Sequence, residues 1–283
     1  MTAAASSRRK RRRRFSPPLI AGGALTLFFV GTAILSLFWT PADPVHMNIV
    51  ARLRGPLQAG LLGTDPMGRD VLSMLMKGAA NSLGLAGSAV LFGGMIGTLA
   101  GMAAAARPEI IGRILMRGND VIFAFPPVLS AILLGALLGP GALTSVIAIG
   151  VFMIPVFARI ARGAALQIWA RDFVHASRMA GKGTLRISLE HVLPNISAQI
   201  IVQGAIQTGL AILTEAGLSF LGLGIAPPDP SWGRMLADAQ TYITIAPHLV
   251  LAPGLAIVCA VLGLNLLGDG LRDLADPRRR QGA

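Results

Sequence analysis

The residues that could carry chemistry are few and scattered along this chain of 283 residues. The four histidines (His46, His175, His191 and His248) form no cluster with the single cysteine, Cys259, and none has the spacing of a metal site. The sequence contains no phosphate-binding loop of the form Gly-x-x-x-x-Gly-Lys-Ser/Thr. We therefore predict no catalytic residue, no metal, no cofactor and no ATP site within this chain.

One polar segment, 170–190, has a composition suited to protein contact. Between Arg171 and Gly181 it mixes charged residues with apolar and small ones, as in a short helix. A Gly-Lys-Gly turn follows at 181–183, where glycine can adopt positive φ, and then a second short helix that we expect to end near Pro194. The first helix is too polar to cross a membrane. Small residues on its outer face suit docking into a groove on another protein, although an interfacial helix that only caps a bundle has the same pattern.

The elements that must position this segment are apolar. Hydrophobic residues make up 53% of the chain and charged residues only 13%, against roughly 25% charged in soluble domains. A membrane-spanning helix needs about 20 apolar residues. The uncharged runs of that length are Pro18–Trp39, Gly78–Ala106, Val121–Ala158, Leu193–Thr214 and Ile243–Gly268.

The run Val121–Ala158 is too long for one span, and Gly139-Pro140-Gly141 interrupts it. The first run is longer than a signal-peptide core and lacks a small-residue cleavage site, so we expect it to be retained. The prediction is an all-α polytopic membrane protein with six spans, at about 18–39, 80–106, 120–138, 142–158, 193–214 and 245–268.

The distribution of charge indicates membrane topology rather than nucleic-acid binding. If the N-terminus is cytoplasmic, 20 of the 25 Lys and Arg residues fall on the cytoplasmic side. This is the positive-inside bias, and it places both termini inside. We expect a basic cytoplasmic tail at 1–16, a membrane domain at 17–270 and a cytoplasmic tail at 271–283. Residues 8–14 either contact anionic lipid headgroups or form a disordered tail.

Three further features leave alternatives open. Gly93, Gly97 and Gly101 repeat at every fourth position, so they suit close helix packing within this chain or against a partner. Phe125-Pro126-Pro127 predicts a kink near the start of the third span, which is typical of a helix that lines a pathway but also occurs without a function. Trp232 and Tyr242, in the outer segment 215–242, suit either a protein interface or a membrane boundary.

The segment from His175 to Pro194 resembles the cytoplasmic loop of binding-protein-dependent ABC importer permeases. That pattern reads Glu-Ala-Ala, three residues, Gly, nine residues, an apolar residue, one residue and Leu-Pro. Here it corresponds to His175-Ala176-Ser177, Gly181, His191 and Leu193-Pro194. The spacing agrees throughout, but His175, Ser177 and His191 depart from the usual residue types. His191-Val192-Leu193-Pro194-Asn195 is similar to the peptide-importer branch.

Three other segments support the resemblance, which covers about residues 17–278. Residues 62–73 are similar to the motif before the second span in the second permease of dipeptide and oligopeptide importers. Residues 218–236 resemble the loop after the fifth span, and residues 265–278 the C-terminal end.

The resemblance implies a type I importer permease in the cytoplasmic (inner) membrane of a prokaryote. Implied partners are a homologous permease subunit, two ATP-binding subunits or domains, and an extracytoplasmic solute-binding protein. The ATPase-coupling residues it implies are Arg171, Asp172, Phe173, Val174, His175, Ala176, Ser177, Arg178, Ala180, Gly181, Leu193 and Pro194. The residues expected to face the binding protein are Asp65, Gly68, Arg69, Asp70, Trp232 and Gly233.

The implied solutes are dipeptides or oligopeptides, while nickel chelates, heme and glutathione-like solutes use similar permeases. Two readings of other classes were considered. A polytopic membrane enzyme would need convergent ionisable residues within its spans, but Asp120 and Glu215 lie only at the edges of the runs. A channel would need a repeated pore motif or charged rings, and the sequence shows neither.

Overall fold

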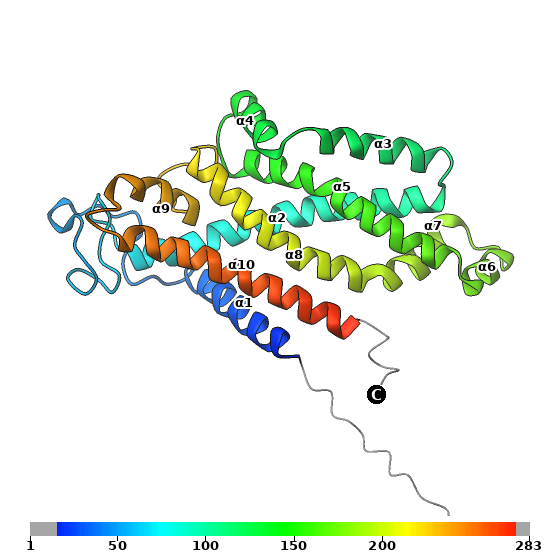
Figure 1. Cartoon of the computed structure of the whole chain (residues 1–283), viewed down its shortest axis with the longest axis horizontal. Coiled ribbons are helices and arrows are strands. Elements are labelled where there is room, and N and C mark those ends of the chain that lie inside the picture. The colour runs from blue at the N-terminus through cyan, green and yellow to red at the C-terminus, as the bar shows by residue number, and fades with distance from the viewer. Residues whose placement is uncertain (1–15, 276–283) are drawn as a thin grey trace, which may run out of the picture.

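The computed structural model describes residues 16–275, and its regular structure is helical. Figure 1 shows an elongated bundle with α6 (Asp172–Met179) and α7 (Thr184–Ile187) at one end. The segment 40–70 and α9 (Trp232–Ala239) lie at the opposite end. The predicted tails, as far as residue 15 and after residue 275, lie outside the described residues. The bundle has a length and polarity suited to crossing a membrane from end to end.

Five helices in the described part of the chain are long and apolar enough to span a bilayer, and a bent pair could make a sixth. The helices that hold these spans are α1 (Pro17–Leu35), α2 (Val71–Ala106), α5 (Ala142–Trp169), α8 (Leu193–Phe220) and α10 (His248–Ala275). The bent pair is α3 (Ile111–Ala124) with α4 (Pro127–Leu138). The predicted all-α membrane fold is confirmed.

The third span differs from the straight segment expected at 120–138. Helix α3 begins at Ile111, and the chain turns by 87° before α4. The break falls at two consecutive prolines, Pro126 and Pro127, whose nitrogens carry no N–H to continue the helical hydrogen bonding. With 12 residues, α4 is about 18 Å long. It is too short to cross a 30 Å hydrocarbon core by itself.

Most helices extend beyond the predicted spans. Helix α2 starts at Val71 rather than near residue 80, and Asp70 caps it by accepting a hydrogen bond from the Ser73 N–H at 2.8 Å. With 36 residues, α2 is about 54 Å long. Helices α5, α8 and α10 continue past the expected ends, to Trp169, Phe220 and Ala275, while α1 ends four residues early at Leu35. A charged residue ends an uncharged run in the sequence. The helix itself continues where water can solvate the charged side chain.

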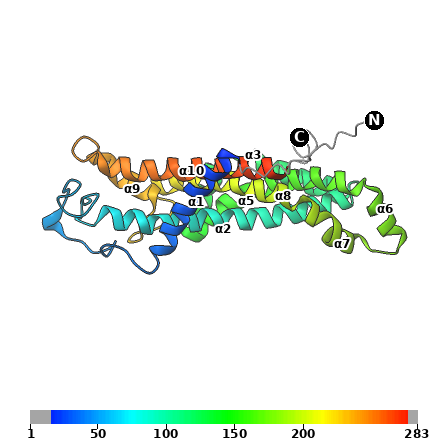
Figure 2. The same ribbon diagram turned by 90° about the horizontal axis from the view of Figure 1, so that it is seen from below.

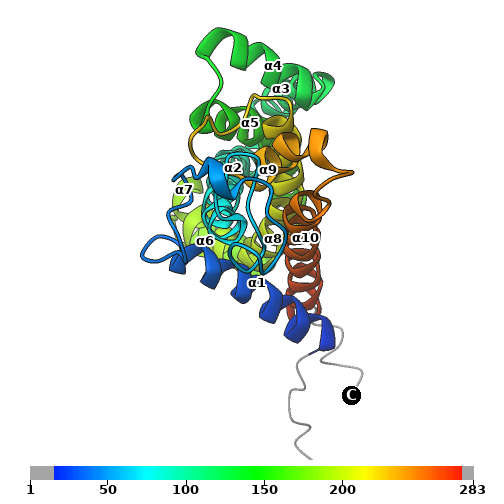
Figure 3. The ribbon, with the colours of Figure 1, turned by 90° about the vertical axis from the view of Figure 1, so that its left-hand side faces the viewer.

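The centre of the bundle is formed by α2 packed along α5, with α8 beside both (Figure 1). Viewed along the long axis, α3 and α4 lie on one side of this centre, and α1 with α10 on the other (Figure 3). Helices α1 and α10 run antiparallel: a β-carbon at Gly270 would lie 2.6 Å from the Leu19 Cα. The N-terminal end of α1 therefore lies beside the C-terminal end of α10.

The repeated glycines of α2 face α5 within the same chain, which resolves the alternative left open above. A β-carbon at Gly97 would collide with the Ile154 carbonyl oxygen and lie 2.8 Å from the Phe157 Cβ. At Gly101 it would collide with the Ala158 carbonyl oxygen. The two backbones touch along this line because no side chain separates them.

Candidate coupling surface

Helix α6 projects from the end of the bundle (Figure 2). Buried apolar side chains fix it there. Val174 of α6 and Ile187 of α7 are fully buried and belong to one apolar cluster with Trp169 of α5 and Ile196 of α8. The Arg178 guanidinium also lies over the Trp169 ring, 4.9 Å from its centroid. These contacts hold α6 rigidly against two long helices.

Gly181 ends α6 in a left-handed conformation, with φ +79°. The N–H of Lys182 donates to the Ser177 carbonyl at 3.1 Å, and the N–H of Gly181 donates to the Arg178 carbonyl at 2.9 Å. These two bonds define a Schellman motif, which requires positive φ at the glycine. Gly181 thus adopts the positive φ that the sequence allows in this turn. Gly183 does not share this conformation, because its φ is −71°.

The sequence predicted that the second short helix ends near Pro194, but the helix continues past this residue. Helix α7 passes through a π-helical turn, Ser188–Val192, directly into α8. Pro194 is the second residue of α8 and follows the π-turn almost directly. The wide π-turn immediately before it provides the space that a proline ring needs. The coupling segment is therefore continuous with a membrane-spanning helix.

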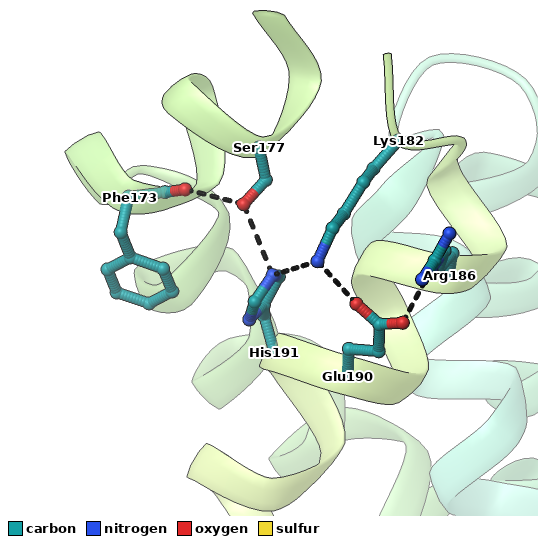
Figure 4. A network of polar contacts seen from close by, with 6 residues as sticks. All are labelled: Phe173, Ser177, Lys182, Arg186, Glu190 and His191. Atoms are coloured by element: carbon teal, nitrogen blue, oxygen red, sulfur yellow. Dashed lines mark hydrogen bonds and ion pairs between the residues drawn. The ribbon is translucent and has the colours of Figure 1, made fainter. Parts of the chain in front are cut away.

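Two residues that depart from the family pattern contact each other. Ser177 Oγ lies 3.1 Å from His191 Nε2 (Figure 4). The Ser177 hydroxyl donates to the Phe173 carbonyl at 2.8 Å, and its oxygen can accept a hydrogen bond from His191 in the tautomer that carries hydrogen on Nε2. The Phe173 ring meets the His191 ring edge-on at 5.9 Å between centroids. These contacts tie α6 to the π-turn.

A cluster of three charged side chains forms at the same turn (Figure 4). Glu190 accepts from Lys182 Nζ at 2.5 Å and from Arg186 Nε at 2.6 Å. Hydrogen bonds from Arg186, and next from Lys182, lower the pKa of Glu190 to about 2. The carboxylate therefore stays ionised at neutral pH. Both side chains of the pair with Lys182 are partly exposed, so its contribution to stability is small.

The outer surface of the coupling segment carries small and apolar side chains. Met179 is 89% exposed, Leu185 is 75% exposed, and Phe173 is 45% exposed. Sequence reasoning omitted Met179, Lys182, Leu185 and Glu190 from the site. An apolar residue two positions after the Gly-Lys-Gly turn was the available signal for Leu185. Of the predicted residues, Val174 is buried, Ser177 and Leu193 are partly buried, and the others are exposed: Arg171, Asp172, Phe173, His175, Ala176, Arg178, Ala180, Gly181 and Pro194.

The residues expected to face a binding protein are instead mostly buried. Asp65 and Arg69 form an ion pair at 2.6 Å with side chains 8% and 9% exposed. Asp65 Oδ1 also accepts from the N–H groups of Met67 and Arg69. Gly68 has φ +75°, and a β-carbon there would collide with the Asn48 backbone. These residues shape the outer segment rather than its surface, so the predicted direct contact is wrong for Asp65, Gly68 and Arg69. Asp70 is partly buried as the cap of α2.

Trp232 is likewise inside the molecule, with no exposed surface. Its indole N–H donates to the Leu75 carbonyl at 3.1 Å, and its ring meets Phe29 edge-on at 5.6 Å. A β-carbon at Gly233 would lie 2.5 Å from the Ala216 Cα. Both residues fasten α9 to the bundle, which corrects the interface prediction for Trp232 and Gly233. Tyr242 is partly exposed.

Replacing Trp232 with Phe is therefore expected to act on stability. The variant keeps an aromatic ring but loses the hydrogen bond to Leu75, which is worth about 1 kcal/mol. Thermal unfolding of the purified permease without any binding protein should show a lower Tm. An unchanged Tm in this preparation, together with weakened capture of a binding protein, would contradict the assignment of Trp232 to the core.

Comparison with known proteins agrees with this geometry. Residues 93–281 match the family described as the binding-protein-dependent transport system inner membrane component. The di/tripeptide transport system permease protein DppC of Pseudomonas aeruginosa is 43% identical over 93% of this chain and 89% of its own. The glutathione transport system permease protein GsiD of Pectobacterium atrosepticum is 40% identical over 92% and 86%.

The fold is also found among solved structures. An inward-facing form of the MetNI methionine ABC transporter matches with a TM-score of 0.59 at 18% identity. The match covers 72% of this chain and 96% of the other. The relatives DppC and GsiD are named as transport system permease proteins rather than as enzymes. This chain belongs to the binding-protein-dependent transport system inner membrane component family and is a multi-pass permease subunit of an ABC importer.

Proposed function

We propose that this permease pairs with a homologous permease to form the pathway for dipeptides or oligopeptides, and that α6 couples this pathway to two cytoplasmic ATP-binding subunits. The observation that carries the coupling role is the physical continuity from α6 to α8. An exposed apolar surface on α6 is anchored through Val174 and Ile187, and α7 runs through the π-turn into α8. A displacement of α6 is therefore transmitted to a membrane-spanning helix.

The mechanism we propose is alternating access. ATP binding draws the two ATP-binding subunits together, and their grooves move the α6 helices of both permeases. Nucleotide can shift the equilibrium only through a difference in its affinity for the two states of the complex. Hydrolysis then resets the pathway, and an extracytoplasmic binding protein supplies the solute.

The outer segment offers a surface for that binding protein. Exposed apolar side chains gather around the buried Asp65–Arg69 pair: Ile49 is 75% exposed, Val50 86% and Leu57 81%. This segment lies at the end of the bundle opposite α6 (Figure 1). A rigid segment with outward apolar side chains suits a transient protein contact.

Reconstitution tests the function directly. Uptake of a labelled dipeptide into vesicles should require ATP, the ATP-binding subunits and the binding protein together. Activity of this chain alone would instead support a channel or a membrane enzyme. Glutathione is a second candidate solute because GsiD is 40% identical. Competition between unlabelled dipeptide and unlabelled glutathione distinguishes the two.

The orientation we propose has both termini and α6 in the cytoplasm, as positive-inside bias requires. Single cysteines at Gln58, in the outer segment, and at Glu109, between α2 and α3, test it in a Cys259→Ala background. Both positions are exposed. An impermeant maleimide should label the Gln58→Cys variant in intact cells, and the Glu109→Cys variant only after permeabilisation. The reverse result would invert the topology.

A further inference from the structure

An exposed ion pair joins α3 to α5 within the apolar part of the bundle. Arg159 Nη2 of α5 donates to Asp120 Oδ1 of α3 at 2.7 Å. The Arg159 side chain is 51% exposed and the Asp120 side chain 65% exposed. The two charges therefore neutralise each other only in part, and each keeps free hydrogen-bonding positions.

Two aromatic rings lie beside this pair. The Arg159 guanidinium stacks over the Phe123 ring, with Cζ 4.4 Å from the centroid. Phe123 meets Phe152 of α5 edge-on, with 5.5 Å between centroids. One acidic, one basic and two aromatic side chains thus come together on adjacent faces of two helices.

The position of the ion pair along the membrane normal would make exposure of its charges to lipid costly. Arg159 is 17 residues from Ala142, the first residue of α5, which corresponds to about 25 Å along the helix axis. If α5 begins at the outer boundary of a 30 Å hydrocarbon core, the pair lies inside that core near its cytoplasmic side. Charged side chains at such positions face the bundle interior or a water-filled path.

Helix α3 separates its polar and apolar exposed residues by face. Arg113, Arg117 and Asp120 follow one another at spacings of four and three, so they share one face. The exposed apolar residues Ile114 and Val121 of α3 lie about 120° and about 100° away from Asp120 around the helix. Lipid contact through the apolar face leaves the polar face for water.

We propose that Asp120 and Arg159 line the solute pathway near its cytoplasmic mouth and contact solutes that carry both an ammonium and a carboxylate group. Asp120 receives the ammonium group and Arg159 the carboxylate, for which a guanidinium offers paired donors. Phe123 and Phe152 provide an apolar surface for side chains of the solute. This inference deepens the proposed peptide import and rests on it for the class of solute.

Cysteine accessibility tests the lining role whatever the solute is. Asp120→Cys and Val121→Cys are compared in a Cys259→Ala background, in inside-out vesicles that contain the assembled transporter. The two positions are adjacent on α3, and both are exposed. A charged methanethiosulfonate reagent should modify the Asp120→Cys variant at least 10-fold faster than the Val121→Cys variant. Vanadate trapping with ATP should slow the faster reaction.

Two results would overturn the lining role. Equal rates at the two positions would place both faces of α3 in one environment. An Asp120→Cys variant that is unreactive with and without nucleotide would place the pair against the partner permease rather than in a water-filled path.

A charge exchange tests the solute contact. The single variants Asp120→Asn and Arg159→Gln should each lower uptake of a free dipeptide at least 10-fold. The double variant Asp120→Arg, Arg159→Asp keeps an ion pair between α3 and α5 and should restore thermal stability, but not uptake. Full recovery of uptake would show that the pair only fastens two helices. If the unmodified transporter carries no dipeptide, the proposed function fails while the accessibility result still stands.

Discussion

Replacing Gly181 with Asp is expected to leave the permease inserted in the membrane but to abolish ATP-driven uptake. At φ +79°, a β-carbon costs about 1 kcal/mol of backbone strain. No atom within the described chain lies within 4 Å of where that carbon would sit, so the fold can accommodate it. The Schellman motif and the docking surface beside it would nevertheless change. The ATP-binding subunits should dissociate, or hydrolyse ATP without transport.

Matched variants separate the effect of backbone strain at Gly181 from the effect of an added charge. Gly183→Asp adds the same charge two residues away, at an exposed position with φ −71° and no atom within 4 Å of a β-carbon. It should retain more coupling than the Gly181→Asp variant. Ala176→Asp places a charge on the exposed face of α6 without backbone strain and should also uncouple. His175→Glu restores the usual family residue at an exposed position and should be tolerated.

Co-purification of the ATP-binding subunits, followed by uptake into vesicles, measures the outcome. Wild-type assembly and uptake in both the Gly181→Asp and the Ala176→Asp variants would show that α6 is only a cap on the bundle. The proposed coupling role would then be wrong.

Replacing Gly97 with Leu is expected to destroy the packing of α2 on α5. Even the first carbon of the new side chain would collide with the Ile154 carbonyl oxygen and crowd Phe157. Because backbone atoms cannot rotate away as a side chain can, the helices must separate along much of their contact. Overpacking by a few methylene groups costs about 1–3 kcal/mol, and separation of two central helices should cost more.

Gly84, on the same helix, provides the control. A β-carbon at Gly84 would meet no atom of the described chain within 4 Å. The Gly84→Leu variant should therefore be produced in the membrane at a normal level, whereas the Gly97→Leu variant should be degraded or unfold at a much lower temperature. Yield of folded monomer in mild detergent and its Tm measure the difference. Equal stability of the two variants would contradict the packing of α2 on α5.

The fold class and the positions of five apolar helices could be predicted from the sequence, because transfer into lipid depends on local composition. An uncharged run such as Leu193–Thr214 identifies a span without knowledge of its neighbours. The position of the segment proposed for coupling could also be predicted from local sequence, because the resemblance rests on spacing and the Gly181 cap depends only on the backbone of the preceding turn.

The ends of the spans could not be predicted in the same way. Charge marks where an uncharged run stops, but α2 and α5 extend beyond their runs because neighbouring helices and water satisfy the extra turns. The 87° turn between α3 and α4 exceeds the kink that two prolines predicted. Its size depends on how the α4 segment packs against α5.

Burial depended on contacts between residues far apart in the chain. Asp65, Arg69 and Trp232 belong to segments that the sequence places outside the membrane, where polar and amphipathic residues are normally exposed. Only the tertiary structure shows that Trp232 contacts Leu75, a residue 157 positions away in the sequence. It likewise brings Ser177 to His191 and Asp120 to Arg159. Local composition determined which segments enter the membrane, and the packing of distant helices decided which face of each segment remains available to a partner or a solute.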